Sequence, residues 1–587
     1  MGTFLNPGGS NAFTELVAKQ DSGIFVDKTD FIAETINRLD AGDLKLIAFT
    51  KPRRFGKTVT AHMLASYYSK GADCKAVFAG LKVAGYSGTK TVNGQKKEIT
   101  YEEYLNRCNV IYWDMNSIDN DFRAYESDKS LYVDYVDDIV DYLQYVTLLE
   151  IRQNREFDEK ISKAPLIGRK SLKQALVATE AKFVLIMDEW DLLYREYRDN
   201  EALQKKFIDM LRGLFKAADG LSCFSLAYLT GILPIKKYNS QSALNNFDEY
   251  NMLHPDTFAP YFGFTDEEVR EICRLPRCPI SQEQLKEWYE GYRFAVNDAD
   301  DNANKADGNS NDNRGKYRLI DVYNPNSVCK AVSRNRCSNY WSSTSSNEEV
   351  IRLINMNFDG IKDDILSMIA GGSVSFNFSS FQNDMVSLTK KDQIFSLLVC
   401  LGYLGCSGQP VSGTERYAYV PNREIRETLI DIVREQPWYN AMPVIARSER
   451  LFQAIRSRDA ANTAEIVGSI HNSSYVSVIG YNREEALVFC LISGLMWCAE
   501  SSYDSFRELP AGKGFADLVF VPKIRTDLPI MIVEFKRDSS AETALKQIKE
   551  QDYAGRYRKD GDEREVLLIG LSYNSGTREH ECLIERM

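Results

Sequence analysis

Near the start of the chain, a short apolar run is followed by a turn and then by the tripeptide Gly56-Lys57-Thr58. The run from Leu46 to Phe49 predicts a buried strand, and Val59 to Tyr68 has the spacing of a helix with one apolar side. A strand, a loop that ends in Gly-Lys-Thr and a helix form an arrangement that binds nucleotide phosphates. The N–H groups of the loop and of the helix N-terminus point at the anion. The segment therefore predicts a nucleotide site in a parallel α/β sheet.

The residues of this loop have chemical roles in that interpretation. Lys57 reaches the β- and γ-phosphates of ATP, and the Thr58 hydroxyl takes one position on Mg²⁺. Gly56 lets the backbone approach the phosphates without a Cβ atom. The first glycine of G-x-x-x-x-G-K-[ST] is replaced by Lys51, so the alternative is a chance tripeptide at an ordinary helix start. The residues expected to line the nucleotide are Arg53, Arg54, Phe55, Gly56, Lys57, Thr58 and Val59.

A second apolar run, Phe183 to Met187, ends in two adjacent carboxylates, Asp188 and Glu189. In nucleotide hydrolases the first such carboxylate holds Mg²⁺ and the second acts as the catalytic residue that polarises the attacking water. The alternative to this catalytic role is that the two carboxylates merely begin a turn at the end of the strand. A third strand, Phe224 to Gly231, brings Thr230 to the same edge, where its hydroxyl either contacts the γ-phosphate or closes a core strand.

Other segments predict the frame around this site. A strand is expected over Asn109 to Asp114, with a carboxylate at its end. Amphipathic helices are expected over Phe31 to Leu39, with Asp30 as the N-cap, over Leu131 to Ile151, and over Glu542 to Tyr557.

Length and composition limit the classes of protein. With 587 residues the chain is too long for one core, so several domains are expected. A net charge of −11 argues against a basic coat, and any nucleic-acid contact must be local. The absence of a long apolar run and of a signal peptide predicts a cytoplasmic protein without membrane contact. The 12 cysteines without a CxxC pair and the four histidines favour buried thiols over a His-based metal centre.

The middle of the chain, about 276–440, differs in composition and in predicted secondary structure from the region before it. A segment rich in Asp, Asn, Gly and Ser, 297–315, predicts a solvated insert. Beyond it, the stretch Gln393 to Leu404 predicts a buried helix that ends near Gly402. Together with a strand over Arg416 to Val420 and a further helix, it suggests a winged-helix module. A plain helical lid is the alternative, and DNA binding does not follow from the fold alone.

The last region, about 441–587, contains a second candidate site. Two predicted strands hold Asp517 and, 17 positions later, the sequence Glu534-Phe535-Lys536. Alternation along the strand puts Glu534 and Lys536 on one face. Two carboxylates can then bind Mg²⁺ or Mn²⁺ through oxygen, and the lysine can orient the nucleophile. A solvated strand end in a structural domain is the alternative. The candidate catalytic or metal residues here are Asp517, Glu534, Lys536 and, as an outer metal ligand, Glu485 or Glu484.

A series of short motifs occurs in order along the chain, namely Val26-Asp27-Lys28-Thr29, Pro52-Arg53-Arg54-Phe55-Gly56-Lys57-Thr58, Asp188-Glu189-Trp190-Asp191, Phe262-Gly263-Phe264-Thr265, Trp288-Tyr289-Glu290-Gly291-Tyr292-Arg293-Phe294, Tyr323-Asn324-Pro325 and Tyr340-Trp341. With these motifs, the chain resembles the AAA-ATPase-like proteins that carry a C-terminal PD-(D/E)xK nuclease domain. A missing first loop glycine is usual in that family.

The resemblance implies an α/β architecture in three parts. These are an AAA-like P-loop ATPase domain at 1–275, a helical or winged-helix-like region at 276–440, and a restriction-endonuclease-like domain at 441–587. It implies a cytoplasmic bacterial protein that hydrolyses ATP with Mg²⁺ and cleaves nucleic acid, DNA before RNA, in DNA processing or defence against mobile elements. A nucleotide-driven switch or scaffold, whose nuclease-like domain binds nucleic acid or protein without cutting, is the alternative.

Overall fold

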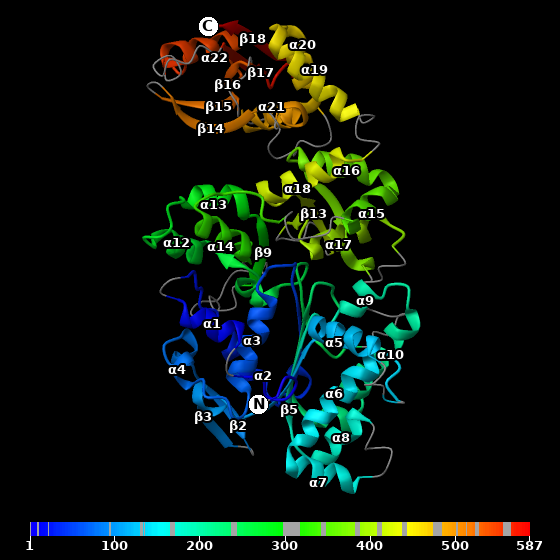
Figure 1. Cartoon of the computed structure of the whole chain (residues 1–587). Helices are drawn as coiled ribbons and strands as arrows, with labels where there is room; N and C mark the ends of the chain where they lie inside the picture. The colour runs from blue at the N-terminus through cyan, green and yellow to red at the C-terminus, as the bar shows by residue number, and fades with distance from the viewer. Residues whose placement is uncertain are drawn as a thin grey trace, which may run out of the picture. The chain divides into compact units, whose positions relative to one another are not determined.

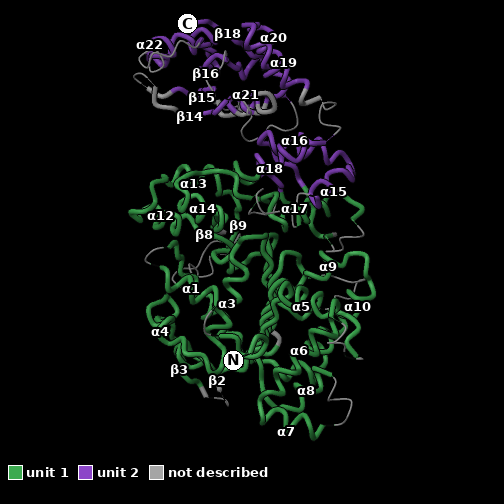
Figure 2. The backbone as a smooth tube through the Cα atoms, in the orientation of Figure 1, with its two compact units in different colours: residues 1–345, 376–416, 421–425 green, residues 346–375, 417–420, 426–587 purple. Residues whose placement is uncertain are grey.

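The computed structural model covers the whole chain (Figure 1), and it divides into two compact units that are coloured separately in Figure 2. Unit 1 comprises 1–345, 376–416 and 421–425, and unit 2 comprises 346–375, 417–420 and 426–587. The structure describes all residues except 1, 9–10, 21–22, 93–94, 129–132, 134, 165–170, 236–243, 298–316, 342–347, 382–387, 408–413, 437–442, 473–483, 500–502, 512–513, 523–527 and 556–564. At some further positions, Glu484 and Glu485 among them, only the backbone is described.

The centre of unit 1 is a five-stranded sheet in the order β4-β5-β6-β1-β7, in which every pair of neighbours is parallel. The register aligns Thr230 with Phe49 on one side and with Asp188 on the other. The phosphate-loop strand β1 and the acidic strand β5 are therefore separated by β6, and Thr230 lies between their ends. The strands are β1 (Leu46–Thr50), β4 (Asn109–Asp114), β5 (Phe183–Asp188), β6 (Phe224–Gly231) and β7 (Asp248–Tyr250).

Helices surround this sheet. Unit 1 also contains two small sheets, β2-β3 and β8-β10-β9, and the short strand β12. The helices are α1 (Ala12–Ala18), α2 (Asp30–Arg38), α3 (Lys57–Tyr68), α4 (Lys75–Phe78), α5 (Met115–Ser127), α6 (Ile139–Gln153), α7 (Arg155–Lys163), α8 (Leu172–Thr179), α9 (Leu192–Glu196), α10 (Glu201–Phe215), α11 (Ala218–Ser222), α12 (Asp266–Arg274), α13 (Gln282–Tyr289), α14 (Pro325–Arg334) and α17 (Lys391–Leu401). The remaining strands are β2 (Ser87–Val92), β3 (Gln95–Thr100), β8 (Phe264–Thr265), β9 (Tyr292–Asn297), β10 (Tyr317–Tyr323) and β12 (Gly405–Cys406).

Apolar runs locate the strands well because β1 and β5 are buried along their whole lengths. The predicted helix starts need correction. The helix expected from Leu131 begins at Ile139, where the Asp138 carboxylate accepts hydrogen bonds from the first backbone N–H groups. Asp30 is the first residue of α2 and not its N-cap, which is Thr29. The predicted insert, 297–315, lies outside the described residues except for Asn297, which ends β9.

The Tyr340-Trp341 motif has a structural task inside unit 1. The backbone N–H groups of Tyr340 and Trp341 donate to the Glu424 carboxylate at 2.8 and 3.0 Å, and the Ser327 hydroxyl donates to it at 2.9 Å. Glu424 is fully buried, and burial raises the pKa of its carboxyl group to about 7. A buried carboxylate thus joins α14 to the segment 340–341.

Three elements lie at the division of the chain into units, namely β11 (Val374–Asn377), β13 (Glu415–Tyr419) and α18 (Arg423–Arg434). The predicted helix before Gly402 is confirmed as α17, and Gly402 ends it with a left-handed φ of 86°. The predicted strand and following helix are confirmed as β13 and α18. A helix, short strands and a helix therefore follow one another in the order that the sequence predicts.

Unit 2 contains a mixed five-stranded sheet in the order β14-β15-β16-β17-β18, in which only β16 and β17 run parallel. Its helix α22 ends at Glu550, earlier than the predicted Tyr557. The elements of unit 2 are α15 (Glu348–Met356), α16 (Ile361–Ile369), α19 (Pro443–Ser457), α20 (Ala460–His471), α21 (Glu484–Ala499), β14 (Tyr503–Ala511), β15 (Gly514–Pro522), β16 (Ile530–Arg537), α22 (Ala541–Glu550), β17 (Val566–Tyr573) and β18 (His580–Arg586).

Among the described residues, none of the helices has the length and the apolar character that crossing a membrane requires.

Candidate functional site

The loop between β1 and α3, residues 51–56, is the phosphate loop of unit 1. Gly56 has a left-handed φ of 78°, which glycine adopts without strain, and α3 begins at the next residue. No heavy atom lies within 4 Å of a Cβ built on Gly56, so the conformation and not local crowding requires glycine here. The loop thus presents backbone N–H groups at a helix N-terminus, as the sequence predicts.

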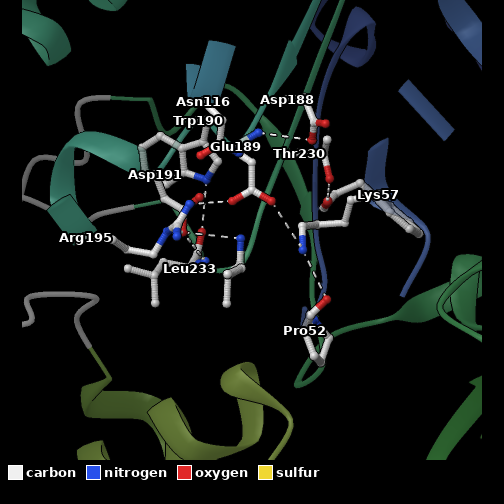
Figure 3. A network of polar contacts seen from close by, with 12 residues as sticks. Pro52, Lys57, Asn116, Asp188, Glu189, Trp190, Asp191, Arg195, Thr230 and Leu233 are labelled. Atoms are coloured by element: carbon white, nitrogen blue, oxygen red, sulfur yellow. Dashed lines mark hydrogen bonds and ion pairs between the residues drawn. The ribbon is translucent and has the colours of Figure 1, made fainter. Parts of the chain in front are cut away.

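Lys57 and the acidic end of β5 meet beside this loop (Figure 3). The Lys57 side chain is 4% exposed, and its ammonium group donates to the Pro52 carbonyl at 3.1 Å and lies 3.6 Å from Oε1 of Glu189. Burial raises the pKa of Asp188 to about 7, and a hydrogen bond with the Thr58 side chain opposes this shift. The structure therefore brings together the residues that were expected to bind Mg²⁺ and ATP.

The hydroxyl of Thr230 lies at this edge but is used within the sheet. It donates to the carbonyl of Phe49 at 2.7 Å, and its side chain is fully buried. The geometry favours a hydroxyl that ties β6 to β1, whereas a contact with the γ-phosphate stays a prediction.

A cavity of about 560 Å³ opens beside the loop. Its lining combines two kinds of surface. One part consists of the phosphate loop and the start of α3, with the Glu189 side chain. The other part is apolar and includes Phe13, Ile24, Phe25 and Met63. A nucleotide has the same division, because its base is flat and apolar while its phosphates are charged. The residues of the cavity fit ATP.

The predicted nucleotide contacts in the loop differ in position. Arg53, Arg54 and Val59 line the cavity, and the Arg54 guanidinium donates to the Asn326 amide oxygen at 3.5 Å. Phe55 also lines the cavity but is buried, and its ring packs edge-on against Tyr292 with ring centroids 5.2 Å apart. Phe55 therefore anchors the loop in the core.

Lys51, which replaces the first glycine, has a position that the sequence did not indicate. Its ammonium group donates to the Tyr261 carbonyl at 2.7 Å and lies 4.6 Å from the centroid of the Phe49 ring. Burial lowers the pKa of Lys51 well below its usual value, and the nearby Lys28 and Lys57 lower it further. The side chain at this position ties the loop to the segment that contains Tyr261.

Sequence reasoning also missed Arg195, on α9. Its guanidinium pairs with Glu189 and, through Nε at 3.1 Å, with the Asp191 carboxylate. Asp191 and Arg195 are four residues apart, which is the spacing of side chains that meet on a helix. This four-residue spacing was the feature of the sequence that could have predicted the ion pair between Asp191 and Arg195.

The second candidate site lies on β15 and β16 of unit 2. These strands are antiparallel, and their register places Asp517 beside Glu534. Oδ2 of Asp517 accepts from the backbone N–H of Phe535 at 2.8 Å, and the Lys536 ammonium group donates to Oε1 of Glu534 at 2.9 Å. Glu534 and Lys536 therefore meet on one face of the strand, as alternation predicts.

Glu534 has an environment that fits a cation. It is 1% exposed, burial raises the pKa of its carboxyl group, and Asp517 raises this pKa further. Its Oε2 has no hydrogen-bond partner among the described residues. A buried carboxylate oxygen with an acid beside it suits a hard cation with oxygen ligands. The side chain of Glu485, the fourth predicted residue, lies outside the described part, which contains no cluster of three or more His, Cys, Asp or Glu residues suited to a metal.

Comparison with known proteins matches the region of each candidate site to a family model. Residues 7–239 match the family model described as a predicted AAA-ATPase, and residues 485–582 match that of the PD-(D/E)XK nuclease superfamily. The chain is also 20% identical over 431 residues to the "Uncharacterized protein in vnfD 5'region" of Azotobacter chroococcum mcd 1. This alignment covers 69% of this chain and 72% of that protein. The chain thus joins a region of the predicted AAA-ATPase family to a C-terminal region of the PD-(D/E)XK nuclease superfamily.

Proposed function

We propose that the protein binds and hydrolyses ATP in unit 1 and cleaves nucleic acid, DNA before RNA, in a metal-dependent reaction in unit 2. The observation that carries the proposal is the meeting of Lys57, Asp188 and Glu189 beside a cavity with one charged and one apolar lining. A role in DNA processing or in defence against mobile elements, in the bacterial cytoplasm, is part of the proposal. The described cysteines are free thiols, which agrees with a reducing compartment.

In the ATP site, Lys57 leaves Glu189 for the β- and γ-phosphates, because the triphosphate carries more negative charge than one carboxylate. Glu189 then accepts a hydrogen bond from the attacking water. The bond between the water oxygen and the γ-phosphorus forms as the bond to the β–γ bridging oxygen breaks. ADP leaves with that electron pair, and the proton that the water loses passes to the Glu189 carboxylate. Thr58 and Asp188 would hold Mg²⁺, which neutralises phosphate charge.

In the nuclease site, Asp517 and Glu534 would hold Mg²⁺ or Mn²⁺, with Glu485 as an outer ligand. Such a cation activates water and stabilises charge on the phosphate. Lys536 is held 2.9 Å from Glu534, so its ammonium group is fixed where it can orient the nucleophile or neutralise the phosphodiester. Thr230, Arg53, Arg54, Phe55 and Val59 complete the proposed contacts of the ATP site.

Two measurements test the proposal on the full chain. The first is ATP hydrolysis with Mg²⁺ by the wild-type protein and by Glu189→Gln, which keeps the shape of the side chain. We expect the variant to bind ATP and to lose hydrolysis, because the γ-phosphate contacts remain while the water loses its acceptor. Hydrolysis at the wild-type rate by Glu189→Gln would refute the assigned role.

The second measurement is the cleavage of supercoiled plasmid, linear DNA and RNA, with and without ATP and Mg²⁺ or Mn²⁺. We expect metal-dependent cleavage that Lys536→Ala abolishes, whereas Lys546→Ala, on the exposed side of α22, cleaves normally. Absence of cleavage of all three substrates by the wild-type protein would favour the scaffold alternative over a nuclease.

A further inference from the structure

The acidic motif at the end of β5 contains two residues, Trp190 and Asp191, that the hydrolytic chemistry does not use. Both are fully buried. The indole N–H of Trp190 donates to the Leu233 carbonyl at 3.0 Å, and the backbone N–H of Leu233 donates to Oδ2 of Asp191 at 2.9 Å. The segment that follows β6 therefore fixes Asp191 from the backbone side (Figure 3).

The same Asp191 oxygen accepts from Nε of Arg195 at 3.1 Å. A second nitrogen of this guanidinium contacts Oε2 of Glu189, while Lys57 approaches Oε1 from the other side. Figure 3 shows the Glu189 carboxylate between these two cations. Arg195 is 11% exposed and Glu189 is 14% exposed, so solvent screens this arrangement only weakly.

We propose that Arg195 is a positioning residue for ATP hydrolysis, which holds the Glu189 carboxylate in place and is itself held by Asp191. The proposal rests on the assignment of Glu189 as the residue that polarises water. Within the described ranges, Lys57 and Arg195 are the cations paired with Glu189. When Lys57 moves to the phosphates, Arg195 is the contact that continues to restrain the carboxylate.

The geometry gives each partner a separate task. A guanidinium has several N–H donors in a fixed plane, so Arg195 can hold Asp191 and Glu189 at once. A lysine at this position has one ammonium group on a flexible stem and would hold the two carboxylates less rigidly. Asp191 takes part in no predicted contact with ATP, and it is connected to the Glu189 carboxylate through Arg195.

The test measures the steady-state hydrolysis of MgATP and the equilibrium binding of ATP for the full chain and its variants. We expect Arg195→Ala to lower kcat by about 10- to 100-fold, since a small misplacement of a catalytic group costs up to about that much. KM and the Kd for ATP should stay within about twofold, because the described ion pairs of Arg195 are with Glu189, Asp191 and Glu196, none of which belongs to the phosphate loop. Arg195→Lys should recover part of kcat, and Asp191→Asn should lower it without changing the Kd. Arg212→Ala, which removes a half-exposed arginine from α10, is the matched control.

A double-mutant cycle separates positioning from a loss of folding. If Arg195 acts through Glu189, adding Arg195→Ala to Glu189→Gln should not lower the residual rate of hydrolysis, measured at high protein concentration, any further. An additive loss, or an equal fall in ATP binding, would overturn the proposal. A wild-type kcat in Arg195→Ala would overturn it as well. A wild-type protein that fails to hydrolyse ATP would instead refute the proposed function, so the two failures can be told apart.

Discussion

Replacement of Glu424 by glutamine should change how the stability of unit 1 depends on pH. The wild-type carboxylate is fully buried and accepts hydrogen bonds from Ser327, Tyr340 and Trp341. Glutamine has nearly the same shape, and its amide oxygen can accept from the same backbone N–H groups, but it does not ionise. The variant therefore isolates the effect of the buried charge.

The pKa of Glu424 gives the size and the sign of the effect. Burial raises it from 4.5 to about 7 in the folded protein. Because the folded state binds the proton more tightly, the stabilisation from Glu424 is fully present below pH 4.5 and is lost as the pH rises through about 7. One pH unit corresponds to about 1.36 kcal/mol, so about 2–3 kcal/mol should be lost between pH 5 and pH 8.

Urea unfolding followed by tryptophan fluorescence measures this loss. We expect the free energy of unfolding of the wild-type protein, minus that of Glu424→Gln, to fall by about 2–3 kcal/mol from pH 5 to pH 8. Glu271→Gln, at a position 67% exposed on α12, should show no such change. A difference that stays constant, or grows with pH, would mean that the three hydrogen bonds outweigh burial, and it would refute the reasoning.

Three further predictions concern Gly402 at the end of α17, Thr230 in the parallel sheet and the nuclease site. Gly402→Ala should lower the free energy of unfolding by about 2–4 kcal/mol in thermal denaturation, because its φ is 86° and a Cβ would lie 2.8 Å from that of Pro52. Gly360→Ala, with a φ of 79° and Oδ2 of Asp363, at 4.0 Å, as the nearest atom to the added Cβ, should lose only about 1–2 kcal/mol, and equal losses would contradict the steric argument. Thr230→Val should lose about 1–3 kcal/mol in the same assay, since the Phe49 carbonyl loses its donor, whereas Thr230→Ser should be nearly neutral. In calorimetry, Asp517→Asn should weaken Mn²⁺ binding, whereas Lys536→Ala should not. If Asp517→Asn binds Mn²⁺ with the affinity of the wild type, the metal site has been assigned to the wrong residues.

Much of the sheet and the ATP site is readable from the sequence because apolar runs and charged residues follow one another without interruption. Buried strands such as Phe183–Asp188 are apolar along most of their length, and the carboxylate that ends this strand marks the edge where ligands bind. Helix starts are less readable. The segment before Ile139 continues the apolar periodicity, but the Asp138 side chain caps the helix there.

Tertiary contacts account for what the sequence could not predict. Glu424 stands in the first turn of a helix, where an acid is usually solvated, and only the packing around Ser327 and Tyr340 buries it. Arg195 looks like an ordinary charge on a short helix, because its partner Glu189 lies outside that helix. Lys51 breaks a known pattern, and only the position of the Tyr261 carbonyl explains what holds its side chain.

Titration calorimetry with Mg²⁺, which measures the binding of ATP to the wild-type protein and to Lys57→Ala, decides whether the loop at Lys57 is an ATP site. We expect binding by the wild type and a Kd at least about 30-fold higher for Lys57→Ala, since a buried charged contact is worth about 2–5 kcal/mol. Lys75→Ala, which removes an exposed lysine from α4, should bind like the wild type. Equal affinity of Lys57→Ala and the wild type, or no binding by the wild type, would refute the assignment of this loop as the ATP site.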